Sequence, residues 1–211
     1  MNRILSSKWA KVVVFLLGLA PFAALFWFAF VDNDLTPNPI EYVTHYTGDW
    51  TLRFLLITLS ITPLRMLLNR PAITRFRRML GLFTFFYGCL HMLTWVWFDH
   101  QFEISKMIED VVKRIYITVG MTGFLSMLPL AITSTAGWVR RLTFKKWQKL
   151  HRLIYVAGSA GVLHYYWLVK SDKRLPEMYA TILFALLAVR VINWMRKRVP
   201  RGAGAPLRAG D

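Results

Sequence analysis

Two histidines, His151 and His164, lie on one apolar stretch of this sequence, residues 146–167. An ionisable side chain at membrane depth is costly and usually faces a bundle interior, a water path or a ligand, so two on one stretch indicate a site. Their separation corresponds to roughly 20 Å along a helix at about 1.5 Å per residue. Neutral imidazole is well suited to bind iron axially in b-type haem. The spacing therefore fits two redox centres stacked through a membrane.

A haem held from both faces also needs a ligand on a second helix. His91 is the single histidine of the apolar stretch 79–98, and Arg77 stands fourteen residues before it. On an ideal helix fourteen residues return to within about 40° of the starting direction, which suits two ligands aimed the same way. Arginine, however, stays protonated and has no lone pair to offer iron. Arg77 is therefore interpreted as a flanking residue, a neighbour of haem propionates or an unusual ligand.

The step from His151 to His164 fits a straight helix less well. Thirteen residues leave the two side chains about 140° apart around the axis. The helix is therefore expected to tighten or kink between them, around Gly158 or Gly161.

Composition places the chain among membrane proteins. Of its 211 residues 55% are hydrophobic and 15% aromatic, and the mean hydropathy is +0.38. Several apolar runs are long enough to cross about 30 Å of hydrocarbon. The net charge of +16 lies in short clusters between these runs, which encodes membrane topology and does not indicate nucleic-acid binding. The single cysteine, Cys89, excludes an internal disulfide and a thiolate metal cluster.

The runs predict an all-α, polytopic integral membrane protein with a six-helix transmembrane bundle. The first run exceeds the usual apolar core of a signal peptide, so it is interpreted as a retained helix. The predicted parts are an N-terminal segment, a haem-binding transmembrane domain with six spans, and a flexible basic tail. Their boundaries are 1–8 for the segment, 9–195 for the domain, about 9–31, 51–68, 79–98, 115–135, 150–169 and 179–194 for the spans, and 196–211 for the tail.

Two connecting segments carry the remaining histidines. Residues 32–50 are turn-rich and are predicted to form a loop in which His45 faces solvent. Residues 99–114 are predicted to form a short amphipathic piece at the membrane surface, with His100 at the water boundary and uninvolved in the site.

The distribution of Lys and Arg predicts the orientation. Twenty of the 27 lie on the side of the two termini and seven on the other side, so both termini are expected to be cytoplasmic. Spans three and five then run in the same direction. His91 is expected to pair with His164 near the outer face, and Arg77 with His151 near the inner face. The inner pair leaves two alternatives: a haem bound by His151 with an unusual sixth ligand, or no haem.

Four segments stand out in combination: FLLITLSITPLR, RRMLGLFTFFYGCLH, LAITSTAG and KKWQKLHRLIYVAGSAGVLHYYW. They resemble the MsrQ (YedZ) family, and the resemblance covers about residues 10–195. This family supplies haem-bearing membrane subunits of the bacterial periplasmic methionine sulfoxide reductase system and belongs to the ferric-reductase-like transmembrane group with the NADPH oxidases. The resemblance implies b-type haem held by His91, His151 and His164. The oxidases place a histidine where Arg77 stands, so the number of haems, one or two, stays open.

The resemblance also implies partners and a location. Electrons would come from the respiratory quinone pool and pass to MsrP, a periplasmic molybdopterin enzyme that reduces methionine sulfoxide in proteins, at the bacterial inner membrane. Family members are also associated with flavin mononucleotide (FMN), for which this sequence shows no motif. The residues themselves show neither a dinucleotide-binding glycine motif after a strand nor an evident acid–base constellation. An electron-transfer subunit, rather than the catalytic one, is therefore expected.

Other function classes stay open. A ferric reductase or another haem-based electron carrier would share the haem ligands and differ in the final acceptor. A transporter would use the histidines to relay protons or bind a metal ion, and internal repeats would favour it, but no convincing repeat is present. A purely structural subunit would leave three intramembrane histidines unexplained.

Overall fold

The computed structural model describes residues 7–30 and 37–198, and every regular element in this part of the chain is helical. A six-residue 3₁₀ segment, Pro71–Phe76, precedes α4, and a π-helical turn, Trp95–Asp99, follows it. The α-helices are α2 (Lys8–Phe30), α3 (Pro39–Leu68), α4 (Arg77–Thr94), α5 (Ile104–Lys113), α6 (Ile115–Ile132), α7 (Ala136–Leu142), α8 (Phe144–Leu150), α9 (Leu153–Leu168) and α10 (Arg174–Arg198). The predicted all-α fold is confirmed.

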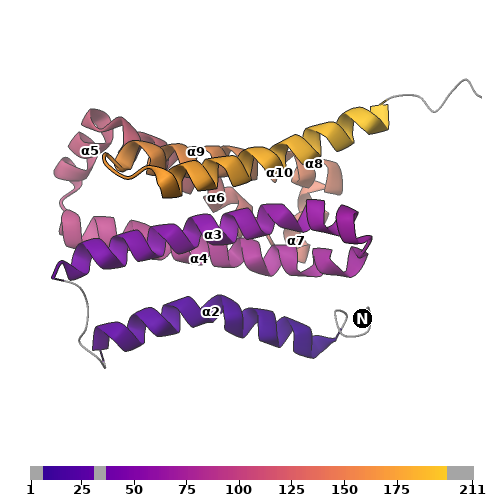
Figure 1. Ribbon diagram of the computed structural model, residues 1–211, viewed down its shortest axis with the longest axis horizontal. Coiled ribbons are helices and arrows are strands. Elements are labelled where there is room, and N and C mark those ends of the chain that lie inside the picture. Colours follow the sequence, from indigo (N-terminus) through magenta and orange to yellow (C-terminus); the bar gives the residue numbers. More distant parts are fainter. Residues whose placement is uncertain (1–6, 31–36, 199–211) are drawn as a thin grey trace, which may run out of the picture.

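Five helical segments are long and apolar enough to cross a membrane, namely those containing α2, α3, α4, α6 and α10. The remaining long apolar helix, α9, has 16 residues and therefore measures about 24 Å, slightly less than the hydrocarbon thickness of about 30 Å. It lies beside α6 and α10 in the bundle (Figure 1). The chain is thus a multi-pass bundle of five full-length spans with α9 as a shorter sixth helix.

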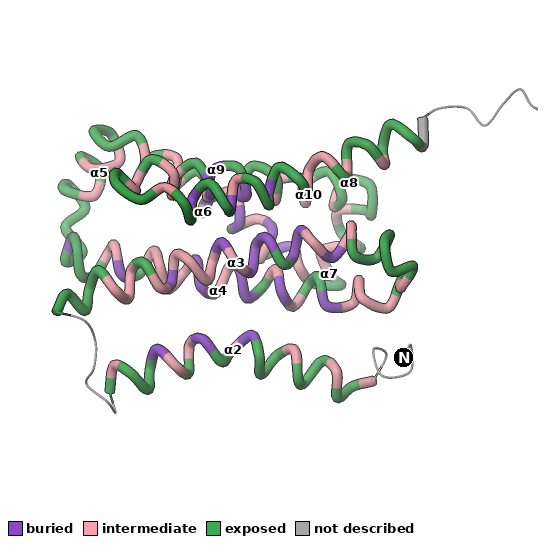
Figure 2. The backbone as a smooth tube through the Cα atoms, in the orientation of Figure 1, coloured by how far each residue is buried: buried purple, intermediate pink, exposed green. Residues whose placement is uncertain are grey.

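The helices form layers. Figure 1 shows α3 and α4 running side by side, with α6, α9 and α10 on one side of them and α2 on the other. Buried residues gather on the inward faces of α3, α4 and α9, whereas most of the outer surface is exposed (Figure 2). Much of that exposed surface is Leu, Val, Ile and Phe, as expected for helices whose outer faces contact lipid.

The start of α3 corrects the loop predicted over residues 32–50. The helix begins at Pro39, while residues 31–36 lie outside the described part of the chain. The side chain of Asn38 accepts a hydrogen bond from the Glu41 N–H at 3.3 Å and so caps the helix. Proline suits the first helical turn because its missing N–H would have no helical partner there. The prolines that suggested a loop therefore mark a helix start.

The last helix is longer than the predicted span 179–194. It runs over Arg174–Arg198, so that its charged first and last turns continue the apolar middle as helix. Residues 196–198 of the predicted tail are therefore helical, and residues 199–211 lie outside the described part of the chain.

Helix α10 is tied to α3 at a proline. Pro63 has no N–H, so the carbonyl of Leu59 one turn earlier lacks its usual helical donor. The guanidinium of Arg190 donates hydrogen bonds to this carbonyl and, within its own helix, to the carbonyl of Leu186 at 2.9 Å. An arginine placed within an apolar helix thus satisfies a backbone acceptor of its neighbour.

Helix α2 is attached through Tyr87 of α4, whose side chain is fully buried. The Tyr87 hydroxyl accepts a hydrogen bond from the Phe22 N–H at 3.0 Å and donates one to the Gly18 carbonyl at 2.9 Å. It therefore bridges two backbone groups that pair directly in an undistorted helix. Pro21 lies in the same turn, where α2 bends (Figure 1). A side chain of a neighbouring helix thus completes the backbone hydrogen bonding at a proline kink.

Replacing Tyr87 by phenylalanine is expected to lower the free energy of unfolding in detergent by about 1–3 kcal/mol, because two buried backbone groups lose a partner. Tyr42→Phe is the matched control, since the Tyr42 hydroxyl makes no hydrogen bond within the described residues. Denaturant titration of both variants measures the effect. Equal stability of the two variants would show that the bridge does not hold α2.

Candidate cofactor site

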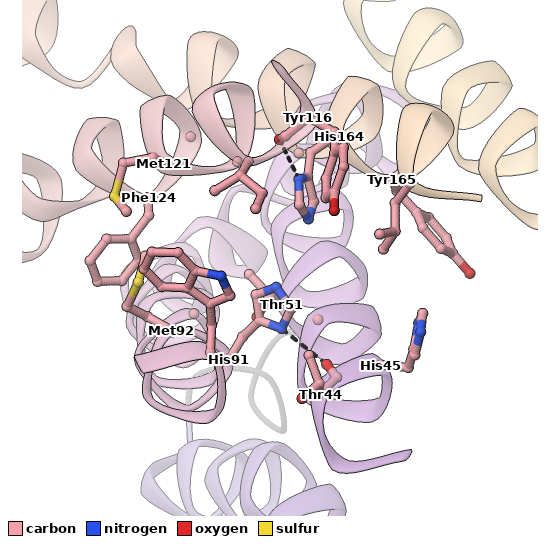
Figure 3. Close-up of a pocket in the computed structure, with 18 of the residues that line it drawn as sticks. Thr44, His45, Thr51, His91, Met92, Tyr116, Met121, Phe124, His164 and Tyr165 are labelled. Atoms are coloured by element: carbon pink, nitrogen blue, oxygen red, sulfur yellow. Dashed lines mark hydrogen bonds between the residues drawn. The ribbon is translucent and has the colours of Figure 1, made fainter. Parts of the chain in front are cut away.

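A cavity of about 680 Å³ lies between α3, α4, α6 and α9 near the end of the bundle that carries α5. Pockets of this size commonly hold small molecules and cofactors. Its walls are largely apolar, and five glycines from four helices line it: Gly48, Gly88, Gly120, Gly123 and Gly161. His91 and His164 project into it from α4 and α9 (Figure 3).

The two imidazoles face each other across the cavity. Their ring centres are 6.2 Å apart and their planes are inclined by 74°. Imidazole nitrogens bind metals at about 2 Å, so two rings that share one metal ion from opposite sides have centres about 6 Å apart. The outer pair, His91 with His164, therefore has the separation of two axial ligands of one metal.

Backbone carbonyls orient both rings. His91 Nδ1 lies 3.0 Å from the Thr44 carbonyl of α3, and His164 Nδ1 lies 2.7 Å from the Tyr116 carbonyl of α6 (Figure 3). A carbonyl only accepts hydrogen bonds, so each Nδ1 carries the proton and each Nε2 keeps its lone pair. Such a hydrogen bond is the usual support of a metal-binding histidine.

Two glycines allow the neighbouring helices to approach these rings. A Cβ atom added to Gly48 would lie 3.0 Å from His91 Cε1, and one added to Gly120 would lie 2.7 Å from His164 Nδ1. The second distance is shorter than side chains tolerate. Glycine at these positions therefore lets α3 and α6 bring their carbonyls to the histidines. Neither glycine was predicted to belong to the site, although Gly120 interrupts an apolar helix.

Most of the charged side chains that line the cavity are acidic. Four carboxylates line it, from Glu41, Asp49, Asp99 and Asp110. His45 lines it as well, exposed on α3 and not on a loop, 3.8 Å from Glu41.

His100 departs from its predicted place at the water boundary. Its side chain is 7% exposed, with Nε2 3.1 Å from the Asp110 carboxylate and Nδ1 3.1 Å from the Trp95 carbonyl. Helix α5 packs against α6 and brings Asp110 to the imidazole. His100 therefore belongs to the wall of the cavity and connects two helices.

The inner histidine lies outside α9. The predicted continuous span 150–169 is broken, because α8 ends at Leu150, His151 caps it, and α9 begins at Leu153. The change of direction expected between His151 and His164 therefore occurs at a turn before α9 rather than at a glycine within it.

The inner pair differs from the outer pair. The His151 ring stacks on Trp147, with centres 3.8 Å apart, and its Nδ1 lies 3.1 Å from the Trp147 carbonyl. Its Nε2 is buried and completes no hydrogen bond of standard geometry within the described residues, and the backbone of Leu130 lies close to the ring. Arg77 is near enough for electrostatic interaction with His151, but no hydrogen bond joins the two side chains in the described structure. The structure thus brings His91 and His164 face to face and leaves His151 without a facing ligand.

This chain is similar in sequence to proteins of a known family. The profile of the ferric reductase like transmembrane component family matches residues 47–162. A relative from Herminiimonas arsenicoxydans is 51% identical over 195 residues, which is 92% of this chain and 89% of the relative. Relatives from Bordetella pertussis, 47% identical, and Xanthomonas campestris pv. campestris, 50% identical, each cover 89% of this chain and 91% and 87% of their own lengths. All three are named protein-methionine-sulfoxide reductase heme-binding subunit MsrQ.

The chain belongs to the MsrQ family. Its assignment to the ferric-reductase-like transmembrane group agrees with the apolar helices, so this MsrQ-family chain is a multi-pass membrane protein. The matched region includes Gly48, His91 and Gly120, and it ends two residues before His164. The family membership predicted from the four sequence segments is thereby confirmed.

Proposed function

We propose that this MsrQ-family chain is a transmembrane b-type cytochrome in which His91 and His164 hold one haem in the outer cavity. The facing imidazoles, 6.2 Å apart, are the observation that carries the proposal. The donor set fits a haem because both Nδ1 atoms are engaged by carbonyls and both Nε2 atoms are left to bind iron. The relatives named heme-binding subunits support the same cofactor.

The haem would supply one-electron chemistry, and the chain would supply its ligands and its surroundings. The Thr44 and Tyr116 carbonyls make the imidazoles stronger donors, which favours the ferric form. Apolar side chains on the cavity wall would keep water from a bound iron; these are Leu52, Leu55, Phe124 and Met127.

A second haem at the inner face is proposed at His151. Its buried Nε2 without a hydrogen bond of standard geometry supports ligation there. Arg77 is proposed as a neighbour of that haem or as its unusual sixth ligand, because its charge reaches His151.

We further propose that quinol in the bacterial inner membrane supplies the electrons and that the acceptor is MsrP, a periplasmic molybdopterin methionine sulfoxide reductase, with both termini of the chain cytoplasmic. The names of the relatives, which refer to a methionine sulfoxide reductase, and the strong charge asymmetry of the sequence support this. FMN stays a prediction from the family resemblance.

The experiment that tests this function uses purified protein in liposomes. Addition of a short-chain quinol is expected to reduce the haem, and subsequent addition of MsrP with a methionine sulfoxide substrate is expected to reoxidise it, both followed by absorbance. The His164→Ala variant is the control, because it lacks the proposed ligand. A haem that quinol leaves oxidised would contradict the proposed donor.

Ferric iron is a second candidate acceptor, and the four carboxylates at the cavity rim favour it because they attract cations. The same liposomes distinguish the two. Reoxidation of the haem by a ferric chelate, with none by MsrP and sulfoxide, would identify a ferric reductase.

A further inference from the structure

The charges around the outer cavity are unequal. Arg114 is the single Lys or Arg among the described residues that line it, whereas four carboxylates do so. A haem carries two propionate carboxylates, and a carboxylate removed from water needs a cation or hydrogen-bond donors. In an acidic rim, Arg114 is therefore the side chain that suits a propionate.

Arg114 is placed close to the proposed haem ligand. It lies between α5 and α6, two residues before Tyr116, whose carbonyl orients His164. The Arg114 Nε lies 3.2 Å from the Asp110 carboxylate, and Nη1 donates a hydrogen bond to the Tyr116 hydroxyl at 3.3 Å. These contacts, the one to Tyr116 foremost, raise the pKa of Arg114, so the guanidinium stays charged.

The Arg114 guanidinium is held by two neighbouring side chains and still has N–H groups available for a further acceptor. Asp110, which pairs with Arg114, also contacts the buried His100 at 3.1 Å, so the carboxylate is fixed from two sides. A guanidinium has five N–H groups, and the contacts to Asp110 and Tyr116 engage two of them. Three remain for another acceptor, with a planar geometry that matches a carboxylate.

Arg53, a second arginine near this end of the bundle, is directed elsewhere. Its Nε donates to the Tyr179 hydroxyl at 3.0 Å, and its guanidinium lies 4.9 Å from the centre of the Trp50 ring. It does not line the cavity.

We propose that Arg114 binds a propionate of the haem held by His91 and His164, with Asp110 as the positioning residue for its guanidinium. The inference rests on the proposed function, because it requires the haem in the outer cavity. It assigns a cofactor-binding role to a residue outside the histidine set.

The first test measures how fast haem leaves the purified protein. Haem transfer to excess apomyoglobin is followed by absorbance for the wild type, Arg114→Gln, Arg114→Lys and Lys113→Gln. Lys113 is the matched control, since it neighbours Arg114, carries the same charge, pairs with Glu109 and does not line the cavity. Arg114→Gln is expected to release haem about ten to a hundred times faster than the wild type. Arg114→Lys is expected to show a smaller increase in the release rate, and Lys113→Gln is expected to release haem at the wild-type rate.

The second test alters the propionates themselves. Haem-depleted protein is reconstituted with haem or with its dimethyl ester, in which both carboxylates are blocked. Esterification is expected to speed haem release from the wild type and to change little in Arg114→Gln, because the partner is already missing. The proposal would be overturned if esterification sped haem release from Arg114→Gln by the same factor as from the wild type. Equal release rates of Arg114→Gln and Lys113→Gln would overturn it as well. A wild-type protein that binds no haem through His91 and His164 would instead overturn the proposed function.

Discussion

Alanine in place of His91 or His164 is expected to remove the outer haem from the purified protein. In the proposed site each imidazole would supply one of the two iron ligands, and among the described residues the ring of each of these histidines is paired with that of the other and with no third histidine. If the outer site holds the sole haem, the α-band of the reduced-minus-oxidised spectrum disappears. If His151 holds a second haem, about half of the haem remains in a pyridine haemochrome assay.

The matched control for this experiment is His45→Ala. His45 lines the same cavity but is exposed on α3 and lies beside Glu41, so its removal is expected to leave the haem content unchanged. The His151→Ala variant then distinguishes one haem from two, because it lowers the haem content per protein only if His151 holds a second haem. Full haem content in both His91→Ala and His164→Ala would refute the outer pair.

Gly120→Ala is expected to weaken haem binding about ten- to a hundredfold, although residue 120 carries no donor atom. The added methyl group would lie 2.7 Å from His164 Nδ1, so either the ring or α6 must move. Movement of either breaks the hydrogen bond to the Tyr116 carbonyl, which orients the ring. Haem titration of depleted protein, followed at the Soret band, measures the loss.

Gly81→Ala is the matched control, because residue 81 lies within α4 and does not line the cavity. There the new methyl group would meet Thr58 Cγ2 at 3.7 Å, an ordinary contact, and haem affinity is expected to stay at the wild-type value. Thermal unfolding of both variants separates ligand misplacement from loss of the fold. Equal haem affinity of Gly120→Ala and the wild type would show that the ring position does not depend on this close approach.

The outer histidine pair could be predicted because its signals are local. An imidazole in an apolar run is rare enough to indicate a site, and the asymmetry of Lys and Arg gives each run a direction. Together these placed His91 and His164 at one depth before any coordinates. The structure adds that they face each other across a cavity.

Other parts of the site depend on contacts that no local pattern encodes. Gly48 and Gly120 matter because α3 and α6 approach histidines far away in the sequence. His100 is buried because α5 packs against α6 and brings Asp110 to it.

Helix boundaries were predicted least well where polar residues end an apolar run. The cap at Asn38 starts α3 about three turns before the apolar part predicted from residue 51, and a turn at His151 separates α8 from α9. Hydropathy averages over a window and therefore registers neither a cap nor a single turn.

The bridge between Tyr87 and α2 has a consequence for biogenesis. The proline kink belongs to α2, whereas the hydroxyl that completes its hydrogen bonding is 65 residues further along, in α4. A backbone defect exposed to hydrocarbon is costly, so α2 reaches its final conformation only after α4 has entered the bilayer. Maturation of α2 is thereby coupled to the order of membrane insertion.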